Sequence, residues 1–245
     1  MKRALSILVL LVLSVALFAG GQKEAQKPGT TTATTKEIKN PDTFIYVSHG
    51  DAETLDPCKA YDNASGGVIQ NIYETLVYYD GPSTDKFVPI LAEQVPTVEN
   101  GGITNGGKTY RFKIRKGVTF HSGNPLTPED VRYSFLRALV TDPDAGPIWM
   151  FYSPFFGTSG SRDDDGNIVA KFEDFEKAVK VEGDYVVFNL RAPFPPFLAT
   201  LCGSWSSIVD KKFCIEHGDW DGTAATWKKY NAPKDGAEIL NHIAS

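Results

Sequence analysis

Hydrophobic and polar side chains alternate along residues 109–115, where Tyr110, Phe112 and Ile114 are separated by basic residues. A period of two predicts a strand with one apolar face and one charged face. Lys116-Gly117 permits a turn, and the alternation resumes over residues 118–120. The pattern therefore predicts a strand, a turn and a second, short strand.

The pattern changes to a helical period directly after this segment. Thr127 offers a hydroxyl N-cap, Pro128 suits the first helical position, and Glu129 and Asp130 place negative charge in the first turn. Apolar residues follow at helical spacing, namely Val131, Phe135, Ala138 and Leu139. We expect a helix with one buried stripe, ended by Thr141-Asp142-Pro143.

Similar patterns predict the other elements. The β-branched and aromatic run 43–47 predicts a strand. A helix is expected after residues 65–67, with its apolar positions at Val68, Ile69, Ile72, Leu76 and Val77. Hairpin turns are expected at residues 100–102, 105–107 and 182–184, and a short helix at 172–178.

The first 40 residues differ in composition from the rest. A basic start and a short apolar run, with small residues at 19–21, predict a signal peptide over residues 1–21. Residues 22–40 are rich in Lys, Gln and Thr and predict a disordered tether. The folded domain is expected over residues 41–245. The net charge of −5, with basic and acidic residues mixed, argues against nucleic-acid binding.

Catalytic motifs are missing from the sequence. It has no G-x-S-x-G elbow, P-loop, dinucleotide fingerprint or H-E-x-x-H. A calcium loop that began at Asp163 would need a glycine at position 168, where the sequence has Ile168, so we interpret Asp163–Asn167 as a polar turn, and His121 as a turn residue. We expect no enzyme, no catalytic residue, no metal and no cofactor. Of the three cysteines, Cys58, Cys202 and Cys214, at least one is unpaired, and Cys202 and Cys214 either form a bridge or are buried free thiols.

The order of residues from Gly107 to Phe135 resembles that of extracellular solute-binding protein family 5, the dipeptide, oligopeptide and nickel class that feeds ABC importers. The shared pattern is tyrosine-x-phenylalanine, arginine, lysine-glycine-valine, phenylalanine-histidine, glycine, proline-leucine-threonine, glutamate-aspartate-valine, tyrosine-serine. Further blocks agree, namely Leu55-Asp56-Pro57, the run 73–77, the run 89–93, and the proline- and phenylalanine-rich step 193–197 before a helix.

The resemblance implies an α/β, periplasmic-binding-protein-like fold of two lobes (class II type), of which residues 41–245 would supply most of the first lobe. The family's glycine-threonine-glycine-proline-tyrosine motif is expected just beyond residues 237–244, so the chain is expected to be truncated before the second lobe. The implied partners are an oligopeptide or oligosaccharide solute and ABC permease subunits, for a monomer that works by hinge closure. The implied location is periplasmic or cell-surface, although residues 17–22 contain no lipobox cysteine.

Two places suit ligand binding. The loop Ser48-His49-Gly50 follows the first predicted strand, where an extended peptide would pair with its backbone. In the aromatic cluster 149–156 most side chains are expected in the core, and Trp149 and Tyr152 are the ligand candidates because they carry polar groups. The family's acidic partner for a peptide amino terminus lies in the later lobe, so this chain alone is expected to bind cargo poorly.

Two alternatives remain open. The first is a secreted carbohydrate-active enzyme, which would need two carboxylates facing one cleft at about 5–10 Å. The second is a non-functional truncated product.

Overall fold

The computed structural model describes residues 40, 42–47 and 50–232, and it divides the chain into two compact units, Met1–Tyr46 and Val47–Ser245. The predicted signal peptide and nearly all of the predicted tether lie outside the described residues.

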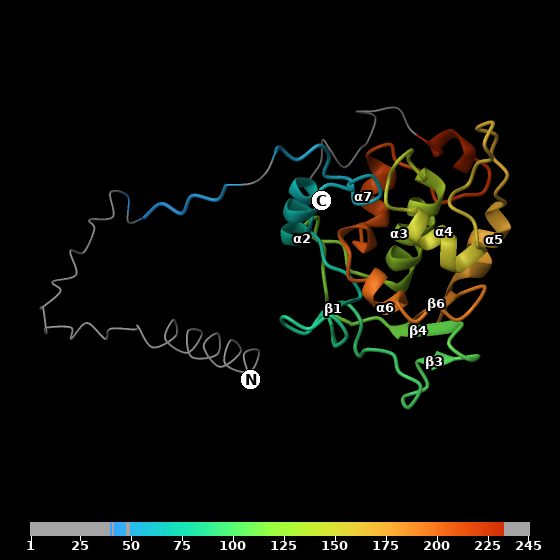
Figure 1. The fold of residues 1–245 in the computed structure, drawn as a ribbon, viewed down its shortest axis with the longest axis horizontal. Helices are drawn as coiled ribbons and strands as arrows, with labels where there is room; N and C mark the ends of the chain where they lie inside the picture. Colours follow the sequence, from blue (N-terminus) through green and yellow to red (C-terminus); the bar gives the residue numbers. More distant parts are fainter. Residues whose placement is uncertain (1–39, 41, 48–49, 233–245) are drawn as a thin grey trace, which may run out of the picture. The chain divides into compact units, whose positions relative to one another are not determined.

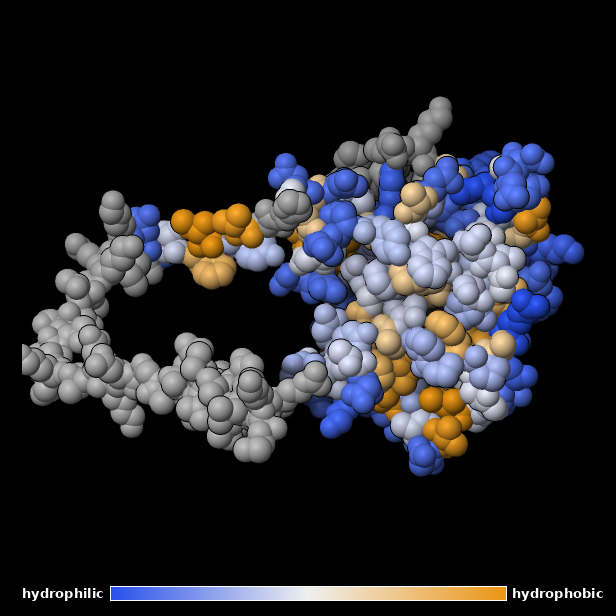
Figure 2. Space-filling view, in the orientation of Figure 1, coloured by the Kyte–Doolittle hydropathy of each residue, from blue (hydrophilic) through white to orange (hydrophobic). Residues whose placement is uncertain are grey.

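The described residues of the first unit, 40 and 42–46, form neither a helix nor a strand. The strand predicted over residues 43–47 is wrong for this structure, because none of these residues is paired in a ladder. The side chains of Phe44, Ile45 and Tyr46 are exposed, and Figure 2 shows the hydrophobic colour of this segment. A strand needs a neighbouring strand for its backbone groups, and the side-chain pattern alone cannot supply one.

The second unit is built on a four-stranded antiparallel sheet in the order β3-β4-β6-β5 (Figure 1). Its strands are β3 (Ile103–Thr104), β4 (Thr109–Lys113), β5 (Val179–Glu182) and β6 (Tyr185–Asn189). The alternation predicted for β4 is confirmed, since Tyr110 and Phe112 are buried and Phe112 is opposite Val186 in the ladder. The predicted turns at 105–107 and 182–184 are confirmed as the β3–β4 and β5–β6 connections.

Helix α3 (Pro128–Thr141) packs against β5 and β6. Its start is the predicted one: Thr127 is the N-cap, and a reciprocal capping box joins it to Asp130. Its end is also the predicted one, with Asp142 in the left-handed conformation at the C-cap. The ring of Phe135 meets those of Phe151 and Phe188 edge to face, so this helix holds the centre of the core.

Shorter helices surround α3 and the sheet. They are α4 (Trp149–Phe156), α5 (Phe172–Ala178), α6 (Phe197–Thr200), α7 (Lys211–Glu216) and the 3₁₀ turns η1 (Ser204–Ser206) and η2 (Trp227–Tyr230). Figure 1 shows α4 and α5 on one side of α3, and α2 (Asn63–Ile72) on the other. The helix predicted over 172–178 is confirmed as α5, and the helix expected after the 193–197 step is α6.

The helix predicted after residues 65–67 begins and ends about five residues earlier than its apolar pattern suggested. Helix α2 spans Asn63–Ile72, and Tyr73 is already extended, with φ −111° and ψ 158°. Leu76 and Val77 are buried, but Val77 begins strand β1 (Val77–Tyr79), which pairs with β2 (Phe87–Pro89). An apolar run is buried equally well by a helix or by a strand, so its pattern did not locate the change.

Two predicted turns are confirmed, and one predicted strand is not. Asp163–Asn167 is a turn in which the Asp163 carboxylate accepts backbone N–H groups of Asp165 and Asn167. Residues 118–126 form a tight hairpin with His121 in its exposed turn, but only a single bridge, Thr119 with Pro125, replaces the expected short strand. Pro125 has no N–H to extend a ladder.

The three cysteines are buried free thiols, so the Cys202–Cys214 bridge is not formed. The Cys202 thiol donates instead to the carbonyl of Leu198 at 3.3 Å.

Candidate functional site

A buried charge cluster fixes the loop that leads from Gly50 to the start of α2. The guanidinium of Arg137, on α3, donates to both oxygens of the Asp56 carboxylate at 2.8 and 2.7 Å. Its Nε donates to Asp219 at 2.7 Å, so one cation bridges two carboxylates from distant segments. All three side chains are almost fully buried.

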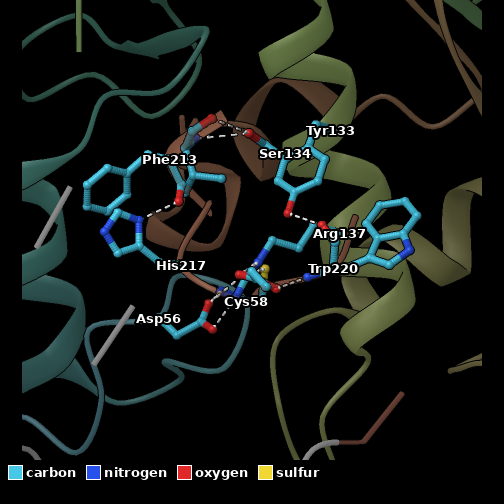
Figure 3. A network of polar contacts seen from close by, with 10 residues as sticks. Asp56, Cys58, Tyr133, Ser134, Arg137, Phe213, His217 and Trp220 are labelled. Atoms are coloured by element: carbon cyan, nitrogen blue, oxygen red, sulfur yellow. Dashed lines mark hydrogen bonds and ion pairs between the residues drawn. The ribbon is translucent and has the colours of Figure 1, made fainter. Parts of the chain in front are cut away.

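The same cluster continues on both sides of Arg137 (Figure 3). The Cys58 sulfur lies 3.0 Å from Nη1 of Arg137, and the Cys58 backbone N–H donates to Asp56. The second oxygen of Asp219 accepts the Trp220 N–H, and the Tyr133 hydroxyl donates to the Trp220 carbonyl at 2.7 Å. The Tyr133 and Trp220 rings are stacked, 5.5 Å between centroids. The cluster therefore joins the loop, α3 and the segment after α7.

Opposite charge decides the ionisation of the cluster. Burial by itself would raise the pKa of the Asp56 carboxyl, but the adjacent Arg137 guanidinium reverses this and the net pKa is lowered. Burial would lower the pKa of Arg137, but Asp56 and Asp219 hold it well above its ordinary value. For Cys58, burial dominates and raises the thiol pKa. The cluster thus contains two carboxylates, one guanidinium and a neutral thiol, with no activated nucleophile.

Hydrogen bonds to Ser65 hold the remainder of the loop. The Ser65 hydroxyl, in the first turn of α2, accepts the backbone N–H groups of Glu53 at 2.9 Å and Thr54 at 3.2 Å. Asp62 caps the helix by accepting the Ser65 N–H at 2.8 Å. Gly50, the described residue of the predicted binding loop, has φ +101°, which strongly favours glycine. Ser48 and His49 lie outside the described residues.

The structure separates the two aromatic candidates of the sequence. Tyr152 is a core residue, 1% exposed, and its hydroxyl donates to the Leu139 carbonyl at 2.7 Å. Its hydroxyl is already paired inside the protein, so the structure does not support the prediction that Tyr152 contacts a ligand. Trp149, three residues earlier on α4, is 46% exposed. The predicted core role of Phe151 and Phe155 is confirmed.

Trp149 has an aromatic partner that sequence reasoning missed. Its indole N–H donates to the hydroxyl of Tyr61 at 3.2 Å, and the two residues are 88 positions apart. Tyr61 is 50% exposed, and its ring meets that of Trp205 edge to face at 6.3 Å. The only local signal for Tyr61 is its place directly before the N-cap Asp62. We call Tyr61 and Trp149 the aromatic pair.

A separate cavity of about 410 Å³ lies between the end of α2 and the hairpin 118–126. It is lined by both apolar and polar side chains, including Tyr73, Glu74, Phe120 and His121. None of the candidates Gly50, Trp149 and Tyr152 lines it, so this cavity and the sequence prediction indicate different places for a ligand. Among the described residues, no cluster of three or more His, Cys, Asp or Glu side chains is arranged to hold a metal ion.

Comparison with known proteins decides the family. The model of the bacterial extracellular solute-binding proteins, family 5, matches residues 86–238 of this 245-residue chain. The chain belongs to this family. The family assignment agrees with the motif order from Gly107 to Phe135.

Two curated relatives show how much of a family 5 protein the chain covers. It is 30% identical over 246 aligned residues, 98% of its length, to the probable deoxycholate-binding periplasmic protein YgiS of Escherichia coli K12. It is 26% identical over 95% of its length to the oligopeptide-binding protein OppA of Bacillus subtilis 168. The chain spans 40% of the length of each relative.

Solved structures of periplasmic peptide-binding proteins share the fold. The Haemophilus influenzae OppA complex with the peptide RPPGFSPFR matches with a TM-score of 0.55 and 22% identity, covering 69% of this chain and 31% of that chain. The expected two-lobed binding-protein fold is confirmed, with this chain corresponding to part of it. Within the described residues, no helix is both long enough and apolar enough to cross a bilayer.

Proposed function

We propose that this family 5 protein binds peptides outside the cytoplasmic membrane and delivers them to the permease subunits of an ABC importer. The observation that carries the proposal is the family match over residues 86–238. Curated relatives of the same family include the dipeptide-binding protein of E. coli and OppA of B. subtilis. The proposed location is the periplasm or the cell surface, and the proposed state is a monomer.

The proposed binding site combines the loop Ser48-His49-Gly50 with Trp149. An extended peptide would hydrogen-bond to the loop backbone, which makes affinity largely independent of the peptide's side chains at that point. The Asp56–Arg137–Asp219 cluster supports this proposal, because its buried side chains hold the loop that follows Gly50 in place. Trapping would follow from closure of two lobes around the solute.

The proposal includes no chemical step. Family 5 proteins are solute-binding proteins, and the buried cluster around Arg137 contains no activated nucleophile. The alternative of a secreted carbohydrate-active enzyme predicts consumption of a polysaccharide. Product analysis after long incubation therefore separates the two functions.

A second candidate cargo is a bile-acid-like amphiphile. YgiS, whose name refers to deoxycholate, aligns with 98% of this chain. Deoxycholate combines a rigid apolar face with a carboxylate, so it differs from a peptide in having no repeated backbone donors. The two cargoes are distinguishable in one binding experiment.

Saturation-transfer NMR on the full chain tests the proposal, because it detects ligands with millimolar to micromolar Kd, about −4 to −8 kcal/mol. The ligands are a tripeptide pool, deoxycholate and maltotriose, each in a separate sample. We expect signals from tripeptides and unchanged ligand by mass spectrometry after incubation. If deoxycholate alone gives signals, the cargo is a bile-acid-like amphiphile and not a peptide. Cleavage of any ligand, or no signal from the three, would overturn the proposed function.

A further inference from the structure

Two half-exposed aromatic rings are held together at one point on the surface of the second unit. Tyr61 precedes α2 and Trp149 begins α4, and the indole N–H of Trp149 donates to the Tyr61 hydroxyl oxygen at 3.2 Å. Their exposed fractions are 50% and 46%. Neither ring is needed to fill the core, which is already occupied by neighbouring residues of α4 such as Phe151 and Phe155.

Both rings stand on rigid supports. Tyr61 lies between Ala60, whose N–H donates to the Asp56 carbonyl at 2.9 Å, and the N-cap Asp62. The Arg137 cluster and the α2 cap therefore fix the backbone on both sides of Tyr61. Trp205 supports the Tyr61 ring edge to face, and its own indole N–H donates to the Thr200 carbonyl. A pre-ordered aromatic surface loses little conformational freedom when a ligand binds.

The aromatic pair retains one unused hydrogen-bond donor. The Tyr61 oxygen accepts from Trp149, but its own O–H proton has no acceptor among the residues that the structure describes. The indole N–H of Trp149 is already engaged. The pair therefore presents a broad apolar face beside a single O–H donor, which is complementary to an apolar group that carries an adjacent hydrogen-bond acceptor.

We propose that Tyr61 and Trp149 form a specificity subsite for an apolar, preferably aromatic, side chain of the bound peptide. The side chain lies against the indole and phenol rings, and the Tyr61 hydroxyl donates to the peptide carbonyl beside it. The inference rests on the proposed function. It adds Tyr61 to the site and names the class of peptide that the site prefers.

Two tripeptides and four proteins test the subsite. The peptides are Ala-Phe-Ala and Ala-Ala-Ala, and deoxycholate is the third ligand. The proteins are the wild-type chain, Tyr61→Phe, Trp149→Ala and the control Tyr78→Phe, which removes the hydroxyl of a tyrosine that is 37% exposed in β1. Dissociation constants come from NMR titration, and circular dichroism with thermal unfolding confirms that each variant is folded.

We expect the wild-type chain to bind Ala-Phe-Ala more tightly than Ala-Ala-Ala. Tyr61→Phe should weaken Ala-Phe-Ala binding about fivefold, the effect of losing one neutral hydrogen bond. Trp149→Ala should remove the preference between the two tripeptides, and Tyr78→Phe should leave both affinities unchanged.

The outcomes separate the subsite from the proposed function. If both tripeptides bind the wild type equally, or if the Tyr61 and Trp149 variants bind as the wild type does, the subsite is wrong and peptide binding stands. If only deoxycholate binds and Trp149→Ala weakens it, the pair is supported as a subsite and peptide is overturned as its occupant. If none of the three ligands binds, the subsite and the proposed function both fail.

Discussion

The guanidinium of Arg137 and the carboxylate of Asp56 form two parallel hydrogen bonds, 2.8 and 2.7 Å long, across 81 positions of the chain. The Nε of the same guanidinium donates to the carboxylate of Asp219. One arginine of α3 therefore anchors both the loop before α2 and the segment after α7. Because the three charges are buried, each depends on the others for its counter-charge.

The Arg137 cluster makes a prediction for stability. Arg137→Met leaves two buried carboxylates without a cation, and we expect it to lower the free energy of unfolding by about 3–5 kcal/mol. Urea unfolding followed by tryptophan fluorescence measures the change. In the triple variant Asp56→Leu, Arg137→Met, Asp219→Leu no charge remains unpaired, so it should recover part of the loss. A single variant as stable as the wild type would show that the cluster contributes nothing.

Asp210 predicts a dependence of stability on pH. Its carboxylate caps α7 and accepts hydrogen bonds from Ser122 at 2.5 Å and from Asn124 at 2.8 Å. Burial would raise its pKa, but these hydrogen bonds lower it below the ordinary value of 3.8. The stabilisation is therefore present above the unfolded-state pKa, and it is lost as the pH falls below about 4 through the lower folded-state pKa.

The control for Asp210 is Asp210→Asn, which keeps a good N-cap residue but cannot titrate. Urea midpoints between pH 7 and pH 2.5 should fall less steeply below pH 4 for this variant than for the wild type. Parallel curves would show that Asp210 does not contribute to the acid transition.

The capping box of α3 predicts a smaller effect. Thr127 and Asp130 satisfy each other's backbone N–H groups at the start of the helix. Thr127→Ala should lower the free energy of unfolding by about 1 kcal/mol, whereas Thr127→Ser should be nearly neutral. Thermal or urea unfolding compares the variants. Equal losses for alanine and serine would point to the methyl group of Thr127 rather than to its hydroxyl.

The buried thiols predict slow cysteine chemistry. Burial raises the pKa of Cys202 to about 11 and that of Cys214 to about 12, and it raises the pKa of Cys58 as well. Thiolate is the reactive form, so the folded chain should react slowly with Ellman's reagent at pH 8, and all three thiols should react quickly in urea. Rapid reaction of the folded chain, or fewer than three thiols in urea, would contradict this arrangement.

Local sequence determined the elements whose signals are complete within a few residues. Thr127 and Asp130 predicted the start of α3, the alternation of Tyr110 and Phe112 predicted β4, and Glu182-Gly183-Asp184 predicted the β5–β6 turn. The residue order of the 107–135 segment also indicated the family that the comparisons establish. In each case the residues that decide the structure are neighbours, so no distant contact is needed to read them.

Tertiary structure decided the features that depend on distant partners. It ended α2 before Leu76, buried Tyr152 with its hydroxyl on Leu139, and brought Tyr61 to Trp149 across 88 positions. It also selected Asp56 and Asp219 as the counter-charges of Arg137. The type of a side chain limits what a residue can bind. Whether that residue is buried, and which partner it binds, depend on the segments that the fold places beside it.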